Sequence, residues 1–141
     1  TTEVLEADNP SRPLCGECEK CIEACPTKAI EEPFIVNSNK CLAYHTLENR
    51  EKELPKNIIS KMGTWVAGCD ICQEVCPWNQ KNIPNTDEPD LQPSEWILNI
   101  TKKDALSWND EKWKEHLNGS ALKRIKPWMW RRNISSISNN K

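Results

Sequence analysis

Residues 15–26 read C-G-E-C-E-K-C-I-E-A-C-P, with four cysteines in the spacing C-x2-C-x2-C-x3-C directly before a proline. This spacing is typical of bacterial chains that bind 4Fe–4S clusters. A second run over residues 69–77 reads C-D-I-C-Q-E-V-C-P, and Cys41 lies between the two runs. The chain has 8 cysteines in 141 residues. Because one cubane cluster takes four thiolates, this count predicts two clusters.

The place of each cysteine within its run predicts which cluster it binds. The C-x2-C-x2-C cysteines wrap one cube, whereas the cysteine before proline ligates the other cluster in two-cluster ferredoxins. Cys41 is the cysteine that remains, and it completes the second set. Cluster 1 is therefore expected to be held by Cys15, Cys18, Cys21 and Cys76. Cluster 2 is expected to be held by Cys25, Cys41, Cys69 and Cys72.

Zinc binding and disulfides are the alternative uses of these cysteines. Paired C-x2-C units can form zinc sites, and an even number of cysteines is compatible with a disulfide scaffold. Zinc does not explain the three-cysteine run or the proline after each run, and C-x2-C-x2-C is poorly shaped for local disulfide pairing. Cluster binding requires reduced thiols, so we expect a cytoplasmic protein.

Charge is unevenly distributed along the chain, although the formal net charge is only −2. Residues 1–34 contain eight acidic and three basic residues, whereas residues 111–141 contain eight basic and two acidic residues. Such a basic segment indicates a polyanionic partner, and a solvated helix face is the alternative. No apolar run in the sequence is long enough to cross a membrane.

The chain length suits one domain with a small additional region. We expect residues 1–92 to form a ferredoxin-like cluster domain with an extended lead-in and a proline-rich surface connection. Residues 93–141 are expected to form short helices. In the first region the sequence predicts a helix over residues 17–24, a small β-hairpin around Pro33, and a helix that runs through Cys41 to about residue 50.

In the second region, helix starts are marked by residues whose side chains can cap a helix. Ser94 and Ser120 are expected to be such caps, and so is either Asn109 or Asp110. Pro127 separates the helix that follows Ser120 from a last helix over residues 128–137. The predicted fold is therefore mostly α, with one small hairpin.

Four segments together resemble the epoxyqueuosine reductases, a family of tRNA-modifying enzymes. They are C-G-E-C-E-K-C-I-E-A-C-P-T-K-A-I, C-L-A-Y-H-T-L-E, G-T-W-V-A-G-C-D-I-C-Q-E-V-C-P-W-N and G-S-A-L-K-R-I-K. The resemblance covers most of the chain, and the combination is more specific than the cysteine runs alone. It implies an enzyme that reduces epoxyqueuosine in a tRNA anticodon to queuosine, with electrons passing through two 4Fe–4S clusters to a cobalamin.

The resemblance also implies what this sequence lacks. The cobalamin-binding half of the family lies before the cluster domain and is absent here, and the HEAT-like helical repeat at the end is truncated. The chain is therefore expected to be a C-terminal portion, or a naturally split or shortened form, that is inactive by itself and contains no catalytic residue. The expected partners are tRNA, the cobalamin-binding domain and a reducing donor such as flavodoxin or ferredoxin, and a monomer is expected.

Two other functions share parts of this pattern. A corrinoid-dependent reductive dehalogenase also combines two clusters with cobalamin, but its small substrate gives no reason for the basic C-terminal segment. A stand-alone two-cluster ferredoxin would only carry electrons, and it does not need the 65 residues that follow Cys76. Tight tRNA binding with a steep salt dependence would distinguish the epoxyqueuosine reductase interpretation from both of these functions.

Residues beside cluster 2 are the candidates for contact with the cobalamin. Cys41 and Cys69 lie in the segments most peculiar to the family, which favours Ala43 and Asp70 as corrin contacts. Helix packing for Ala43 and a turn or cap for Asp70 are the alternatives. His45 is a candidate acid or ligand, but a single histidine beside a metal site is more often part of the packing. Trp65 and Trp78 flank the second run and are expected to shield cluster 2 from water.

The basic C-terminal stretch is the candidate for tRNA contact, since lysine and arginine neutralise phosphates. Trp128 and Trp130 are interleaved with it and are expected to pack in the core, with stacking on RNA bases as the alternative. Lys52 and Lys56 are weaker candidates. The RNA-binding candidates in the stretch are Lys123, Arg124, Lys126, Arg131 and Arg132.

Overall fold

The computed structural model describes residues 2–12, 14–81 and 83–137, and these form a mostly helical chain with one two-stranded sheet. The predicted fold class is therefore confirmed, whereas the HEAT-like character of the last helices stays a prediction. Within the described ranges, none of the helices combines the length and the apolar character that a membrane crossing requires. The helices of the first region are α1 (Lys20–Ala24), η1 (Ser38–Lys40), α2 (Leu42–Leu47), α3 (Lys56–Ile59), α4 (Ile71–Glu74) and η2 (Pro77–Asn79). Those of the second are η3 (Pro89–Leu91), α5 (Glu95–Asn99), α6 (Lys102–Ser107), α7 (Asp110–Leu117), η4 (Ala121–Arg124) and α8 (Pro127–Ser136).

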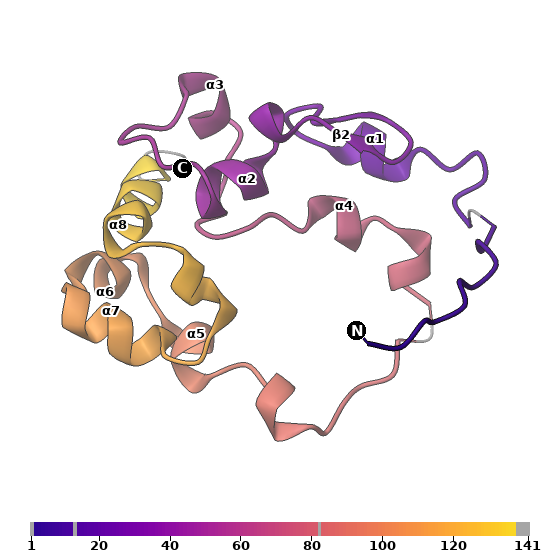
Figure 1. Ribbon diagram of the computed structural model, residues 1–141. Helices are drawn as coiled ribbons and strands as arrows, with labels where there is room; N and C mark the ends of the chain where they lie inside the picture. The colour runs from indigo at the N-terminus through magenta and orange to yellow at the C-terminus, as the bar shows by residue number, and fades with distance from the viewer. Residues whose placement is uncertain (1, 13, 82, 138–141) are drawn as a thin grey trace.

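The two cysteine runs form similar short helices that lie side by side. Helix α1 carries the first run and packs against α4, which carries the second (Figure 1). The predicted hairpin is confirmed: β1 (Ile30–Glu32) pairs with β2 (Ile35–Val36) in antiparallel register, with Ile30 opposite Val36. Helix α1 is shorter than predicted, because Cys18 N–H donates to the Cys15 carbonyl in a turn before the helix begins.

The prediction of a helix running through Cys41 is wrong. Asn37 caps a single 3-10 turn, η1, by accepting a hydrogen bond from the Asn39 amide. Cys41 follows this turn with an extended backbone (φ −75°, ψ 124°) and is the N-cap residue of the separate helix α2. An N-cap residue has non-helical backbone angles, so Cys41 lies at a helix start with its thiol outside the helix interior.

The C-terminal helices begin where short polar side chains cap them. The Asn109 side chain accepts from the Lys112 amide, and the Ser120 hydroxyl accepts from the Leu122 amide, as the sequence predicted. Ser94 is the N-cap residue of α5 but makes no side-chain capping bond. Helix α6 was not predicted, although Thr101 and Asp104 form a capping box at its start. Helix α7 ends at Leu117, and Gly119, two residues later, has a φ of +78° that suits glycine.

The main hydrophobic core belongs to the C-terminal helices. Trp108 and Trp130 stack at 5.7 Å within it, and the Trp130 indole donates to the Ala105 carbonyl. The prediction that Trp130 packs in the core is thus confirmed. The buried residues of this core are Ala105, Trp108, Trp113, Leu117, Ile125, Met129, Trp130 and Ile134.

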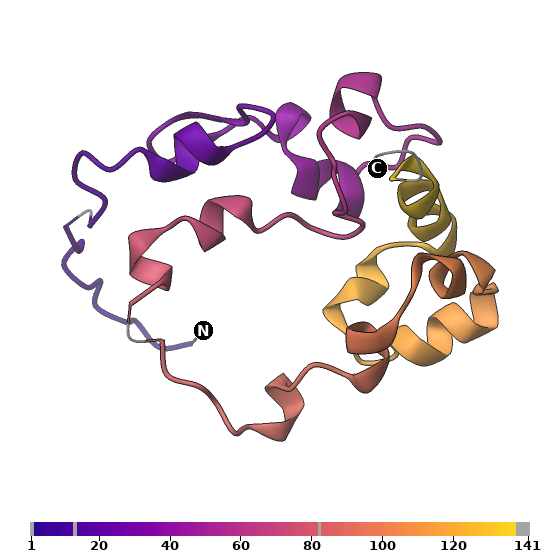
Figure 2. The ribbon, with the colours of Figure 1, turned by 180° about the vertical axis from the view of Figure 1, so that it is seen from behind.

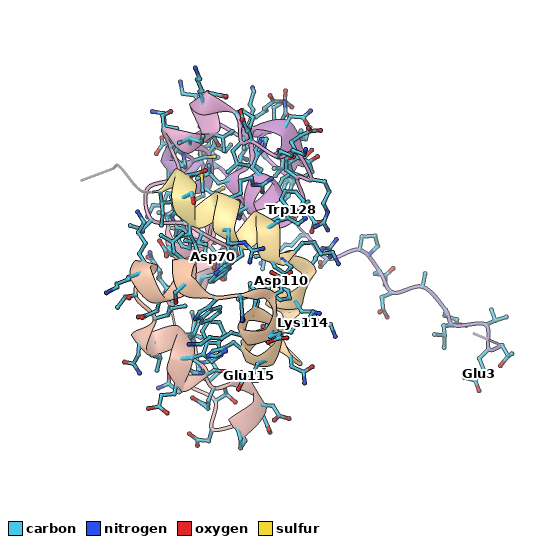
Figure 3. All side chains as sticks on the ribbon, turned by 90° about the vertical axis from the view of Figure 1, so that its left-hand side faces the viewer. Glu3, Asp70, Asp110, Lys114, Glu115 and Trp128 are labelled. Atoms are coloured by element: carbon cyan, nitrogen blue, oxygen red, sulfur yellow. The ribbon has the colours of Figure 1, made fainter. Side chains whose placement is uncertain are left out.

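Helix α8 lies between the two regions of the molecule. In Figure 3 it separates α2 and α3 from the helices α5 to α7, while the lead-in that carries Glu3 extends away from both. Figure 2 shows the same arrangement from behind, with residues 83–94 leading through η3 to α5. Val66 and Ala67 pack against the C-terminal core. The predicted boundary at residues 92 and 93 stays a prediction, and the core extends across it.

Candidate iron–sulfur centre

The first cysteine set, Cys15, Cys18, Cys21 and Cys76, lines one cavity of about 240 Å³. Cys15 and Cys18 lie in the turn before α1, and Cys21 lies in its first turn. Cys76 reaches the same cavity from the end of α4, about fifty residues later in the chain. These are the residues that the sequence assigned to cluster 1. Cys15 and Cys18 are exposed.

The second cysteine set, Cys25, Cys41, Cys69 and Cys72, lines a separate cavity of about 260 Å³. It combines the end of α1, the start of α2 and the two cysteines at the start of α4. These are the residues that the sequence assigned to cluster 2. All four are partly buried, so this cavity is less open to solvent at its thiols than the first.

The last cysteine of each run lines the cavity of the other run, and the proline after it is the local cause. The residue before a proline is driven away from helical angles toward an extended backbone. Cys25 (φ −66°, ψ 113°) and Cys76 (φ −71°, ψ 121°) both adopt such angles, directly before Pro26 and Pro77. Each therefore leaves the helix of its own run and lines the cavity of the other run.

The surroundings of two thiols in the second set shift their pKa in opposite directions. Burial disfavours the thiolate of Cys25, but hydrogen bonds from the Thr27 hydroxyl and from backbone amides, including that of Ala29, outweigh it and lower its pKa. Burial raises the pKa of Cys69, and the neighbouring Cys72, Cys41 and Cys25 raise it further. Burial and the neighbouring thiols therefore disfavour the thiolate of Cys69, whereas hydrogen bonds favour that of Cys25.

The donor set and the cavities fit cubane clusters better than single zinc ions. Zinc holds its cysteines at about 2.3 Å from one ion. Within the described residues, no three histidine, cysteine or carboxylate side chains converge in that way. All eight cysteines are described and free of disulfides, and each set of four thiols surrounds a cavity. Four thiols around a cavity match the ligand requirement of a 4Fe–4S cube.

Ala43 and Asp70, the candidates for cobalamin contact, both line the cavity of the second set. Asp70 is exposed and is the N-cap residue of α4, where its carbonyl accepts from the amides of Gln73 and Glu74. The structure thus brings the two candidates together beside the same four thiols. Contact with a corrin stays a prediction for both.

His45 is a buried packing residue in this structure. Its Nε2 lies 2.8 Å from the Asn39 carbonyl, and its Nδ1 lies 2.9 Å from the Asn49 side-chain nitrogen. The carbonyl needs a donor and the amide nitrogen is one, so both ring nitrogens are engaged in hydrogen bonds. Neither nitrogen remains available for a metal or a substrate.

One prediction about the tryptophans is wrong. Trp78 lines the cavity of the first set and not that of the second, and its indole donates to the Leu14 carbonyl at 3.2 Å. Because the chain turns at Pro77, the residue after Cys76 follows that cysteine to the other site. Trp65 is half-buried, and it is not among the residues that line the second cavity.

The basic C-terminal side chains divide into two groups. Arg124 forms an ion pair with Glu48, and Arg131 forms one with Asp110 at 2.9 Å. The Arg132 guanidinium donates to several backbone carbonyls of the first region, and its contact with RNA stays a prediction. Burial lowers the pKa of Arg132, and Arg50 lowers it further, yet a guanidinium keeps its charge at neutral pH.

Lys123 and Lys126 are exposed and line a cavity of about 560 Å³ together with Lys114 and Glu115. On another face, a shallow groove joins Lys52 and Lys56 to the outer side of α8. The residues that line this basic groove are Lys52, Glu53, Leu54, Lys56, Ile59, Trp128, Arg131, Arg132, Ser135 and Ser136. Trp128 is 39% exposed there, so it is not buried in the core as predicted.

Sequence reasoning missed the role of Asn133. The side chain is fully buried and hydrogen-bonds to two segments far away in the sequence. No local sequence pattern predicts such a residue, because an asparagine inside a helix usually points to solvent and adds little to stability.

Comparison with known proteins supports the cluster assignment and the family. Residues 14–79 match a family described as a 4Fe-4S double cluster binding domain. The chain is 82% identical over 138 residues to an epoxyqueuosine reductase of Prochlorococcus marinus (strain NATL2A), which covers 98% of the chain and 44% of that protein. Over nearly its whole length, the chain is homologous to epoxyqueuosine reductases.

More distant epoxyqueuosine reductases match in the same way. The protein of Yersinia pestis is 38% identical over 136 residues, covering 96% of the chain and 33% of that protein. The chain thus spans less than half the length of the curated relatives it matches. A crystal structure of epoxyqueuosine reductase with an epoxyqueuosine-modified tRNA-Tyr stem loop matches with a TM-score of 0.83 and 31% identity, over 94% of this chain and 34% of that one. The structure from Bacillus subtilis also gives a TM-score of 0.83, at 30% identity.

Proposed function

We propose that the chain is the electron-transfer and tRNA-contacting part of an epoxyqueuosine reductase. The observation that carries this proposal is the grouping of eight cysteines, by crossing between the two runs, into two sets of four around two cavities. Identity to epoxyqueuosine reductases over nearly the whole chain supports the same reaction. The dehalogenase and stand-alone ferredoxin interpretations have no comparable support.

The two cysteine sets act as the ligands of two clusters. When bound, 4Fe–4S clusters supply one-electron transfer at potentials set by their surroundings. The first set has exposed thiols and provides the entry for electrons from a reducing donor of the flavodoxin or ferredoxin type. The second set, with Ala43 and Asp70 beside it, faces the cobalamin-binding part of the complete enzyme.

The tRNA anticodon region binds through basic side chains that the fold leaves exposed. Lys123 and Lys126 lie on one face, and the basic groove with Lys52, Lys56 and Trp128 lies on another. Arg124 and Arg131 are paired with carboxylates and contribute less. Lysines that neutralise phosphates make binding depend steeply on salt.

Metal analysis of anaerobically purified chain tests the cluster assignment. Wild-type chain should contain about eight iron and eight sulfide, with EPR signals of two interacting cubanes on reduction. Cys18→Ser and Cys41→Ser are a matched pair, because each removes one ligand from a different set. Each should reduce the iron to about four, and the two residual spectra should differ. About two zinc ions without sulfide in the wild type would refute the proposal.

A binding titration tests the tRNA contact. The double variant K123A/K126A should weaken binding to an anticodon stem loop about tenfold and lower the salt slope by about two. The double variant K102A/K103A on α6 is the control, since it removes the same charge from another surface. Equal weakening by both pairs would leave only a general charge effect and contradict this placement of the RNA.

A further inference from the structure

Helix α8 reaches into the first region through a side chain that solvent does not touch. Asn133 is fully buried, and its amide nitrogen donates to the Thr46 carbonyl at 2.8 Å and to the Val66 carbonyl at 2.9 Å. Thr46 lies in α2, which Cys41 precedes, and Val66 lies in the segment that leads to Cys69. One side chain of α8 therefore holds both segments that supply these cysteines.

Thr46 connects the same two segments a second time. Its hydroxyl donates to the Leu42 carbonyl at 2.9 Å and accepts from the Gly68 amide at 3.0 Å. Leu42 directly follows Cys41, and Gly68 directly precedes Cys69. Gly68 has φ +76°, a conformation that suits glycine. The residue after Cys41 and the residue before Cys69 are thus held close to each other by the Thr46 hydroxyl.

Arg132 completes the contact at the end of α2. Its guanidinium donates to the carbonyls of His45 (3.0 Å), Asn49 (2.9 Å) and Glu51. It also donates to the Asn133 side-chain oxygen at 2.9 Å, which fixes the orientation of that amide. The last carbonyls of a helix lack partners within the helix, and a cation near them is favourable. Arg132 and Asn133 together therefore cap α2 from another part of the chain.

We propose that Arg132 and Asn133 are positioning residues for cluster 2, so that α8 sets the geometry of the second cysteine set. This inference rests on the proposed function, because it requires that these thiols bind a cluster. The potential of a cluster depends on hydrogen bonds and solvation around its ligands. The first cysteine set receives none of the hydrogen bonds described above, so the effect is confined to cluster 2.

The test compares two variants of the same helix in the full chain with its clusters. Asn133→Ala removes the bonds to Thr46 and Val66. Trp130→Phe is the control, because Trp130 is also buried in α8 but its indole donates to Ala105 within the C-terminal core. Redox titrations followed by EPR give the signal and midpoint potential of each cluster, and the spectra of Cys18→Ser and Cys41→Ser assign the signals.

Asn133→Ala is expected to change the EPR signal and potential of cluster 2, or to lose that cluster selectively, with the iron content falling from about eight to about four. Cluster 1 keeps its signal, and Trp130→Phe changes neither. Wild-type spectra and potentials in Asn133→Ala would overturn the inference, and so would an equal change of cluster 2 in Trp130→Phe.

A second variant and a second readout cover the case in which Asn133→Ala folds poorly. Arg132→Lys keeps the charge but loses the planar fork, and it should shift cluster 2 in the same direction by a smaller amount. In chain without iron, hydrogen exchange at Gly68 should be about tenfold faster in Asn133→Ala than in wild type, and unchanged exchange would contradict the proposal. Wild-type chain that binds no clusters would refute the proposed function, whereas wild-type chain with two clusters and a silent Asn133→Ala would refute this inference alone.

Discussion

The cysteine-bearing helices and the C-terminal helices are stabilised in different ways. Helices α1 and α4, every residue of which is described, contain no buried residue, and they meet around thiols. Helices α6 to α8 surround a continuous core with stacked tryptophans. The cysteine-bearing helices therefore depend on a bound group, whereas the C-terminal helices depend on apolar burial. Small domains with little core commonly depend on metals in this way.

Removal of iron should have the largest effect. It should unfold the cysteine-bearing helices and leave the C-terminal helices folded. Anaerobic chelation is expected to abolish hydrogen-exchange protection in α1 and α4, since without their clusters these helices have too little burial to persist. Helices α7 and α8 should keep their protection because their core does not include the thiols. Mass spectrometry of peptides from both regions measures this. Equal loss in both would mean that the regions unfold as one unit.

A cavity in the C-terminal core should have the next largest effect. It should destabilise the C-terminal region and leave cluster 1 unchanged. Leu117→Ala removes a buried side chain from α7 and should cost about 2–5 kcal/mol of unfolding free energy. Leu106→Ala in α6 is the control, because Leu106 is exposed and should cost well under about 1 kcal/mol. Urea unfolding followed by tryptophan fluorescence gives both values. The EPR signal of cluster 1 should not change, and its loss in Leu117→Ala would show that the first region depends on the C-terminal core.

Removal of a helix cap should give the smallest effect on the free energy of unfolding. It compares a helix that has a side-chain cap with one that does not. Asn109→Ala removes the bond to the Lys112 amide at the start of α7 and should cost about 1 kcal/mol. Ser94→Ala is matched to it, since Ser94 occupies the same position in α5 without a side-chain capping bond, and should cost close to zero. The difference is measured in the same urea experiment. Equal costs would contradict the capping geometry of α7.

Much of this arrangement could be predicted from local sequence. The spacing of the two cysteine runs and the proline after each run predicted two sets of four, because a proline acts on the residue directly before it. The hairpin and the caps at Asn109 and Ser120 followed from patterns a few residues long. The capping box at Thr101 was equally local, but the helix it begins has few apolar residues to mark it.

The errors arose where several local signals competed. The sequence predicted one helix through Cys41, whereas the chain makes a 3-10 turn, extends at Cys41 and then begins α2. Trp78 was expected at cluster 2 because it follows the second run, but it follows Cys76 to the other cavity. The arginines of the basic stretch were treated as one group because they are close in sequence, and their contact with RNA stays a prediction. Their partners Glu48, Asp110 and the carbonyls near Asn49 lie elsewhere in the chain.

By itself the sequence determined the cluster chemistry, since thiolate spacing and the proline effect act over a few residues. It also determined the mostly helical fold and the short elements that its caps begin. The tertiary structure alone decided that α8 lies against α2, that Arg132 binds backbone carbonyls and that Asn133 joins the segments of Cys41 and Cys69. The physical reason is distance along the chain: these bonds connect residues 67 to 87 positions apart, and their donors and acceptors meet only after the whole chain has folded.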